Sequence, residues 1–302
     1  MSAPRPRPES LVWAEQALGR GARVVATRLL TGGLTSLVHE LTVVQKGRRS
    51  RYVLRSWPAD NVHKDWMLRA VAAEAAVLVA LEPSDVPAPR LVASIGDETA
   101  GGPALLMTRM PGRVFLMPRD REHWLRQMAQ TLARIHALEP VGAGFETWLD
   151  AGKLTPPEDA SRAGIWQAAF ALIAEQPKSI CTRFIHRDYQ HFNLLWSRDR
   201  LTGVVDWGGA CVGPPDIDVG HCRLNLTLLF SAQVAERFRE LYEAESGRAV
   251  NPYWDVHALL SYGPDWKTFL PLQIDGRAPL EVEGMTGRME EVLRLALGRR
   301  PA

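Results

Sequence analysis

The segment of the sequence best suited to chemistry spans residues 184–195 and reads FIHRDYQHFNLL. It places Asp188 five residues before Asn193, and thirteen residues further on Asp206 opens the triplet DWG after a short apolar run. Phosphoryl transfer uses this combination, because one aspartate can orient a hydroxyl while carboxylate and amide oxygens hold Mg²⁺. An isolated aspartate beside Gly or Asn more often forms a turn or caps a helix. The three side chains in this order and spacing therefore indicate phosphoryl transfer.

Both motifs fit established patterns. HRDYQHFN fits H-R-D-x-x-x-x-N, and VVDWG fits an apolar strand that ends in a D-F-G-like metal aspartate. On these motifs the sequence resembles the aminoglycoside phosphotransferase family of small-molecule kinases, from about Leu30 to Leu229. The resemblance implies an α+β, protein-kinase-like fold of two lobes. The smaller lobe would be a five-stranded antiparallel sheet with one helix, and the larger lobe would be mainly helical.

The resemblance gives the matched residues roles in a transfer of the γ-phosphate of ATP, or GTP, to a hydroxyl of a small molecule. Asp188 would accept a hydrogen bond from the acceptor hydroxyl and act as general base late in the transfer. Asn193 and Asp206 would hold Mg²⁺ through oxygen atoms. His186 and Asp218 would support the structure, His186 by fixing the loop and Asp218 by bracing it.

The first lobe departs from the kinase pattern at the basic side chain that binds phosphate. In YVLR, strand alternation puts Val53 and Arg55 on one face, where the kinase pattern V-A-I-K has Ala and Lys. A guanidinium can pair with phosphates but differs from an ammonium in geometry, so the departure bears on nucleotide affinity. Glu74 is the expected partner of Arg55, because a carboxylate on a buried helical face needs a cation. The positions three and four residues from Glu74 are all apolar: Ala70, Val71, Val77 and Leu78.

Two further segments are candidates for nucleotide binding. The stretch LTGGLTS, residues 30–36, lies between two expected strands but lacks G-x-G-x-x-G, so an ordinary hairpin turn fits it equally well. Its candidate phosphate ligands are Thr31, Gly32, Gly33 and Ser36. The resemblance places the adenine-binding linker near residue 108. There Thr108 and Met110 would bind adenine through backbone atoms, and Met107 would line the purine pocket.

Hydrophobic patterning predicts the elements that position these residues. Short strands are expected over residues 23–26, 37–44, 52–57, 91–94 and 104–108, with one helix over 63–81. Turn chemistry at Met110-Pro111-Gly112 marks the lobe boundary. Helices follow over 121–138, 165–174, 217–230, 232–244 and 285–297, with short strands at 194–196 and 204–205. We therefore expect a flexible leader and first helix in 1–20, an ATP-binding lobe in 21–110, and a catalytic and substrate-binding lobe in 111–302.

The composition of the chain limits which binding partners and which cellular compartment are expected. The 302 residues are 46% hydrophobic and 23% charged, which suits an ordinary globular chain, and a net charge of +2 gives no basic field for nucleic acid. MSAPRPRPES has no apolar stretch for a secretory signal, and the most apolar segment, 70–81, is too short to span a bilayer. Three cysteines without C-x-x-C spacing suit neither a disulfide framework nor a zinc site. We expect a cytoplasmic monomer or homodimer without membrane or nucleic-acid partners.

The phosphate acceptor stays open between several hydroxylated molecules. The resemblance places its site in about residues 148–180 and 224–266. A polycationic aminoglycoside needs clustered carboxylates, and the available ones are not densely bunched. They are Asp150, Glu158, Asp159, Asp265 and Asp275. Interspersed aromatic residues fit core packing, or a partly apolar pocket for a macrolide, a sugar or an amino alcohol. They are Trp148, Trp166, Tyr253, Trp254, Tyr262 and Trp266.

Two other functions compete with small-molecule phosphorylation. Arg55 and the reduced glycine loop favour a catalytically weak nucleotide-binding module, or pseudokinase. A protein kinase is disfavoured, because no A-P-E motif follows the DWG triplet and only about ten residues separate Gly208 from Asp218.

Two histidines near the motifs have a plainer explanation than catalysis. In the loop, Gln190-His191-Phe192 stands where many relatives have His-Pro-Gly, and we expect His191 to pack rather than to transfer protons, although imidazole can titrate near pH 6.5. His221 beside Cys222 is expected to pack in the core or on a helix surface, because a metal site needs three or four converging donors.

Overall fold

A computed structural model describes residues 4–30, 36–57, 64–177, 180–263, 266–274 and 276–299. The chain divides into two compact units. Unit 1 comprises Met1–Gly112 and Thr202–Gly209, and unit 2 comprises Arg113–Leu201 and Ala210–Ala302. The segment that carries Asp206 therefore belongs with the first part of the chain, although the chain enters and leaves it through unit 2.

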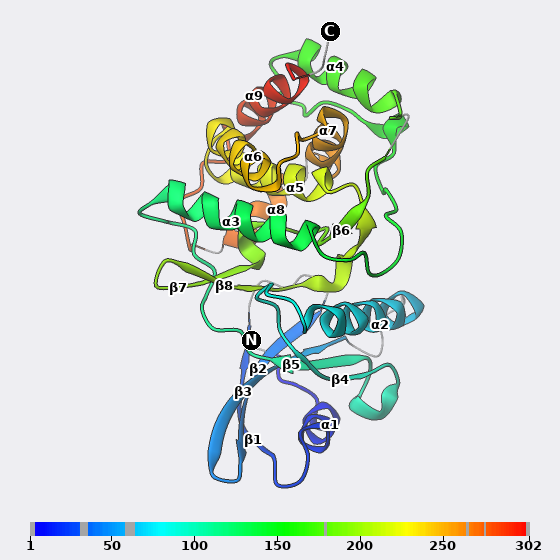
Figure 1. The fold of residues 1–302 in the computed structure, drawn as a ribbon, viewed down its shortest axis with the longest axis vertical. Coiled ribbons are helices and arrows are strands. Elements are labelled where there is room, and N and C mark those ends of the chain that lie inside the picture. The colour runs from blue at the N-terminus through cyan, green and yellow to red at the C-terminus, as the bar shows by residue number, and fades with distance from the viewer. Residues whose placement is uncertain are drawn as a thin grey trace. The chain divides into compact units, whose positions relative to one another are not determined.

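Unit 1 is built on a five-stranded antiparallel sheet in the order β1-β2-β3-β5-β4 (Figure 1). Its strands are β1 (Arg23–Leu29), β2 (Leu37–Gln45), β3 (Arg48–Ser56), β4 (Leu91–Ile95) and β5 (Ala104–Thr108). Side chains alternate between the faces of a strand. Leu54 and Leu106 are paired and belong to one buried cluster, whereas Val53 is paired with Met107 on the opposite face. This register puts Val53 and Arg55 on the face away from that cluster.

Two α-helices accompany this sheet, one within residues 1–20 and one between β3 and β4. Helix α1 (Pro8–Leu18) contributes Trp13 and Ala14 to the cluster around Leu54, and its Ser10 hydroxyl donates to the Ala100 carbonyl at 2.6 Å. This helix begins at Pro8, within residues 1–20, for which a flexible leader and a first helix are expected. Helix α2 (Lys64–Leu81) packs against β4, β5 and the short 3-10 helix η4 (Trp207–Gly209).

Unit 2 is mainly helical and is organised around one buried helix. Its helices are α3 (Arg121–His136), α4 (Ala163–Ala174), α5 (Asp216–Leu229), α6 (Ala232–Ser246), α7 (Pro252–Leu260), α8 (Trp266–Ile274) and α9 (Met285–Leu297) (Figure 1). Every residue of α5 from 216 to 228 is buried, because α6, α7 and α9 all pack against this helix. Side-chain oxygens cap several helix starts, such as Ser231, which accepts from the Val234 amide at 3.3 Å.

Short strands flank the catalytic segment in the sequence. Strand β6 (Arg183–Ile185) pairs with β9 (Cys211–Gly213), and β7 (Leu194–Ser197) pairs with β8 (Arg200–Val204). Between β6 and β7 lie the residues of the HRD motif and the 3-10 helix η3 (His191–Asn193). The sequence predicted neither β6 nor β9, and it placed β8 at 204–205. No helix of the described residues is both long and apolar enough to cross a membrane.

Candidate active site

One buried aspartate of α5 holds the start of the catalytic loop. The Asp218 carboxylate accepts the backbone N–H groups of His186 at 2.7 Å and Arg187 at 2.6 Å, and it lies 3.1 Å from His136 Nε2. Burial opposes its ionisation, but the bonds from His136 and from the His186 backbone keep the pKa of Asp218 below its ordinary value. Asp218 is therefore a fixed negative anchor, as a bracing role requires.

Asp188 is the carboxylate that this loop presents. Its Oδ1 accepts hydrogen bonds from Gln190 Nε2 at 2.6 Å and from His221 Nε2 at 2.8 Å, and its Oδ2 accepts from Asn193 Nδ2 at 2.8 Å. Burial opposes ionisation, yet His221 in particular keeps the pKa of Asp188 below its ordinary value. The side chain remains 35% exposed. Asp188 is thus an ionised, oriented carboxylate that a hydroxyl group can still reach.

Asn193 is oriented by the same loop in a way that suits a cation ligand. Its Nδ2 donates both to the Asp188 carboxylate and, at 2.9 Å, to the Asp188 backbone carbonyl. With the amide nitrogen held in this way, the amide oxygen is the atom that stays available. An amide oxygen is a ligand that Mg²⁺ accepts.

Unit 1 contains a second cluster, centred on Arg55. Its Nη1 lies 2.9 Å from Glu74 Oε2 and 2.7 Å from Asp206 Oδ1, and its Nε donates to the Ser36 hydroxyl at 2.9 Å. The guanidinium also lies over the Trp57 ring, 5.0 Å from the centroid. The structure therefore brings together four of the predicted nucleotide and metal residues, Ser36, Arg55, Glu74 and Asp206.

The charges of this cluster depend on one another. Burial raises the pKa of Glu74, and the negative charge of Asp206 adds to that effect, although Arg55 opposes it. Burial disfavours the charge of Arg55, but the carboxylates of Asp206 and Glu74 more than compensate and raise the pKa of Arg55. The guanidinium therefore stays charged and keeps two carboxylates in place.

Asp206 has the features of a ligand rather than of a core residue. Its backbone φ is +69°, a left-handed conformation that is uncommon for residues other than glycine. Its side chain is 40% exposed, and Arg55 binds only Oδ1. One carboxylate oxygen therefore remains for a cation. Asn193 belongs to unit 2 and Asp206 to unit 1, so a joint magnesium site stays a prediction.

The expected donor set suits magnesium better than a metal that needs a complete protein cage. Within the described residues no group of three or more His, Cys, Asp or Glu side chains converges on a metal site. Magnesium in nucleotide sites is held by one or two carboxylates, by waters and by the phosphates themselves. An amide oxygen from Asn193 and a carboxylate oxygen from Asp206 fit that requirement.

The linker candidates lie at the end of β5. Thr108 uses its N–H to bond the Arg90 carbonyl at 2.9 Å, and its hydroxyl accepts from the Arg90 N–H at 2.8 Å. The Met110 carbonyl accepts a hydrogen bond from the Arg109 guanidinium, whereas the Met110 N–H has no partner among the described residues. Met107 lies beside Val53 in the sheet register. The candidates Thr31, Gly32 and Gly33 lie outside the described residues.

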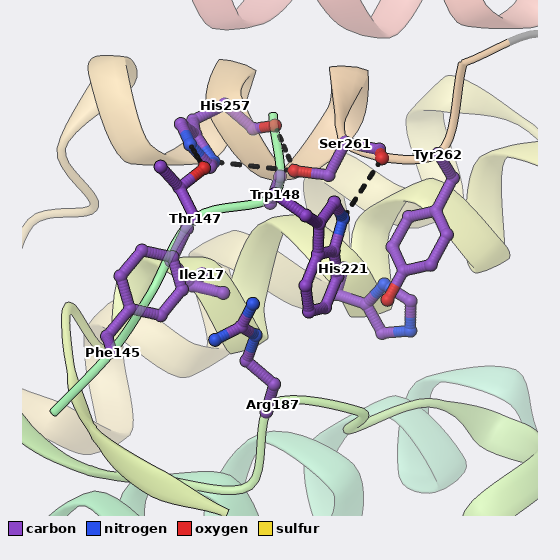
Figure 2. Close-up of a pocket in the computed structure, with 10 residues that line it drawn as sticks. Phe145, Thr147, Trp148, Arg187, Ile217, His221, His257, Ser261 and Tyr262 are labelled. Carbon is purple, nitrogen blue, oxygen red and sulfur yellow. Dashed lines mark hydrogen bonds between the residues drawn. The ribbon is translucent and has the colours of Figure 1, made fainter. Parts of the chain in front are cut away.

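A pocket opens in unit 2 next to the catalytic loop (Figure 2). The residues that line it come from the loop, from α5 and α7, and from the segment that precedes α4. They are Phe145, Thr147, Trp148, Arg187, Ile217, His221, His257, Ala258, Ser261 and Tyr262. Burial, together with the charge of Arg187, lowers the pKa of His257 to about 4, so this imidazole is neutral at pH 7. Burial and the nearby charge of Asp188 raise the pKa of Tyr262, so its hydroxyl keeps its proton.

The sequence did not identify two side chains that hold Asp188. Gln190 and His221 both donate to its Oδ1. The missed signal was spacing, because Asp218 and His221 are three residues apart on α5 and side chains at that spacing share a face. His221 is therefore part of the site rather than only a core residue.

His191 packs in the loop, as expected. Its ring is fully buried against Phe192, with centroids 4.4 Å apart, and burial first of all lowers its pKa to about 3. It is therefore neutral near pH 7 and has no charge to contribute to catalysis.

Comparison with known proteins identifies the family. The model of the phosphotransferase enzyme family, APH, matches residues 28–260. The chain belongs to this family. The sequence-based resemblance is thereby confirmed, and the protein is a small-molecule kinase of the phosphotransferase enzyme family. No curated protein matches its sequence.

Solved structures confirm the protein-kinase-like α+β fold of this phosphotransferase. A candidate aminoglycoside phosphotransferase from Ralstonia eutropha JMP134 is 19% identical with a TM-score of 0.62, covering 97% of this chain and 98% of that one. APH(4)-Ia, solved with ADP and hygromycin B, is 16% identical with a TM-score of 0.58, covering 92% and 96%. Macrolide 2'-phosphotransferase MphH from Brachybacterium faecium is 17% identical with a TM-score of 0.57, covering 98% and 100%.

Proposed function

We propose that this phosphotransferase moves the γ-phosphate of ATP to a hydroxyl group of a small molecule. The observation that carries the proposal is the state of Asp188, whose ionised carboxylate is oriented by Gln190, Asn193 and His221 and is still accessible. Such a carboxylate can accept the hydrogen bond of an incoming hydroxyl and later its proton.

The proposed reaction balances without a further reactant. A bond forms between the hydroxyl oxygen of the acceptor and the γ-phosphorus of ATP, and the bond from that phosphorus to the β–γ bridging oxygen breaks. ADP leaves with the electron pair, and the hydroxyl proton passes to the Asp188 carboxylate and then to solvent. Asp188 contributes mainly by orientation, because phosphoryl transfer asks little covalent chemistry of the protein.

Mg²⁺ is the expected metal in this proposal. When bound, it neutralises charge on the phosphates and so favours the departure of ADP. Asn193 would hold it through the amide oxygen and Asp206 through the carboxylate oxygen that Arg55 does not bind. Arg55 and Ser36 supply donors on the nucleotide side, and Glu74 keeps the guanidinium in place.

The solved relatives support a nucleotide as co-substrate. APH(4)-Ia has been solved with ADP and hygromycin B, and also with AMP-PNP and hygromycin B. We extend the nucleotide requirement to this chain, with ATP as first choice and GTP as the other candidate. The linker supports binding of a purine base, since the Met110 N–H is without a partner in the described part of the chain.

The test is a coupled assay of ADP release with ATP, Mg²⁺ and a panel of hydroxylated acceptors, followed by mass spectrometry of the product. In Asp188→Asn we expect turnover to fall by about 10²- to 10⁴-fold, the contribution of a positioned base, while ATP still raises the melting temperature. The matched control is Asp199→Asn, an exposed aspartate in the β7–β8 turn. Its left-handed backbone, with φ of +60°, also accepts Asn.

Two results would count against the proposal. Equal turnover in Asp188→Asn and Asp199→Asn would remove Asp188 from the reaction. Stabilisation by ATP without phosphorylated product from any acceptor would instead favour the pseudokinase alternative, in which Arg55 holds the nucleotide but does not support transfer.

A further inference from the structure

The pocket of unit 2 carries a positive charge and no negative one. None of its ten lining residues is Asp or Glu, and Arg187 is its one guanidinium. Figure 2 shows this guanidinium directed into the pocket between the rings of Phe145 and Trp148. Its central carbon lies 4.3 Å from the Phe145 centroid and 3.9 Å from the Trp148 centroid. The aromatic faces hold the cation in place without neutralising it.

Arg187 is only partly buried and lacks the carboxylate partner that a buried arginine of this unit has. Arg223, for example, is fully buried and pairs with the carboxylates of Asp255 and Glu236. Arg187 donates to the Glu146 backbone carbonyl at 2.7 Å and contacts the Cys211 thiol, and no carboxylate of the described residues pairs with it. A guanidinium has five N–H donors, so most of its capacity is available to a ligand.

The backbone of Arg187 adopts an energetically unfavourable conformation. Its φ is +73°, a left-handed conformation that glycine adopts freely and other residues adopt at about 1–2 kcal/mol. Strained positions of this kind concentrate at functional sites, where the surrounding structure holds them. Here the Arg187 N–H bond to Asp218 holds the backbone, and the side chain points into the pocket.

Most of the carboxylates that could attract a cationic acceptor are paired elsewhere or lie outside the described residues, and the exposed Glu158 does not line the pocket. Asp150 pairs with Lys153 at 3.1 Å, and Asp159 pairs with Lys267 at 2.6 Å. Asp265 and Asp275 lie outside the described residues. A polycation entering this pocket would therefore meet Arg187 without a compensating carboxylate in its lining.

His221 connects the pocket to the reacting end of the site. Its Nε2 is bound to Asp188, whereas its Nδ1 is buried and has no partner among the described residues. His221 is also one of the residues that line the pocket. A molecule held by Arg187 and His221 would thus lie next to the carboxylate that receives its hydroxyl.

We infer that the acceptor of this phosphotransferase is a small hydroxylated anion, with a carboxylate or phosphate group bound by Arg187 between Phe145 and Trp148. The inference rests on the proposed phosphoryl transfer and names its substrate class. Arginine suits the role because its planar fork binds both kinds of anion through two parallel bonds. The enclosed space of the pocket is about 10 Å³, roughly the room that one water molecule needs, so the portion of the acceptor that enters is very small.

The test compares sugars that share one ring and differ in charge: glucosamine, glucose, glucuronate and glucose 6-phosphate. Binding to the full chain is measured by tryptophan fluorescence and calorimetry, and phosphorylation by ADP release. We expect both anionic sugars, or one of them, to bind about 10- to 100-fold more tightly than glucose, the value of one charge-assisted contact, and glucosamine to bind least. Comparison of glucuronate with glucose 6-phosphate distinguishes a carboxylate from a phosphate acceptor.

Variants of the arginine decide between a ligand site and a structural role. Arg187→Met should reduce the preference for the anionic sugar over glucose by about the same 10- to 100-fold, and Arg187→Lys should restore part of it. The control Arg183→Met, which removes an exposed arginine of β6 outside the pocket, should leave the preference unchanged.

The outcomes separate this inference from the proposed function. Tighter binding of glucosamine, equal binding of all four sugars, or a preference that survives Arg187→Met would overturn the inference. Anion binding that depends on Arg187, without ADP release from any acceptor, would leave the anion site standing and count against phosphoryl transfer.

Discussion

At the scale of single residues, the structure shifts the pKa values of the Asp188 and Glu74 carboxylates in opposite directions. Three donors hold Asp188 and keep its pKa low, although burial opposes this. Glu74 is almost completely buried and its pKa is raised, so its ionised form depends on Arg55. One group is prepared to accept a proton from an acceptor, and the other serves to position a cation.

The dependence of Glu74 on Arg55 gives a stability prediction. Arg55→Met leaves a buried carboxylate without its cation, and we expect the free energy of unfolding in urea to fall by about 3–5 kcal/mol. The double variant Arg55→Met/Glu74→Leu should lose less than the single variant, because both charges are then removed together. The control Arg28→Met removes a guanidinium that is 64% exposed and bound to Glu40, and it should cost less than about 1 kcal/mol. If the double variant lost as much stability as Arg55→Met and Glu74→Leu lose when their separate losses are added, the pair would not be coupled.

At the scale of elements, hydrophobic patterning in the sequence predicted the bounds of an element correctly where that element is long or uniformly apolar. Strand β5 and helix α9 have the predicted bounds, since β5 is apolar almost throughout and α9 repeats buried residues such as Met289, Val292 and Leu293 at helical spacing. The catalytic motif could also be identified from the sequence, because its residues lie close together in the chain.

Elements that depend on distant partners were not predictable. Strands β6 and β9 have three residues each, too few for a period to show, and each exists because the other lies beside it in space. Helix α8 contains Pro271, which removes a backbone donor and argues against a helix from local sequence. The role of His221 also depends on the packing of α5 against the loop, although its three-residue spacing from Asp218 places both side chains on one face of α5.

The contact between α5 and α7 gives a prediction about one glycine. A Cβ added at Gly220 would lie 2.6 Å from Ala258 Cβ and 2.8 Å from the Asp255 carbonyl oxygen, so the two helices must separate. We expect Gly220→Ala to lower the free energy of unfolding by about 1–3 kcal/mol, as overpacking does. It should also reduce turnover, because Asp218 and His221 on the same helix hold the catalytic loop.

The matched control for this glycine is Gly287→Ala in α9. No atom lies within 4 Å of the Cβ position there, so the helix should gain up to about 1 kcal/mol from the better helix former. Urea unfolding and ADP release compare the two variants directly. Equal stability for both would mean that α5 and α7 are not in close contact at Gly220.

At the scale of the whole molecule, buried ionisable groups set the response to acid. Asp188 and Asp218 keep a low pKa, so the folded chain holds these carboxylates ionised where the unfolded chain would protonate them. Their contribution to stability is present above the pKa of an unfolded aspartate and is lost as the pH falls through the folded value. The two histidines with lowered pKa reduce stability at higher pH, where these carboxylates still contribute in full.

Burial lowers the pKa of His191 to about 3 and that of His257 to about 4, against about 6.5 in an unfolded chain. Between pH 6 and pH 5 the unfolded state therefore binds about 1.5 to 1.9 more protons than the folded state. A difference of one proton changes the free energy of unfolding by about 1.4 kcal/mol per pH unit, so these two imidazoles should reduce it by about 2.4 kcal/mol as the pH falls across that interval. In His191→Leu this slope should fall by about half. The control His123→Leu, which removes an exposed imidazole of α3, should keep the full slope. Urea unfolding at several pH values measures it, and an unchanged slope in His191→Leu would show that this imidazole is protonated inside the folded chain.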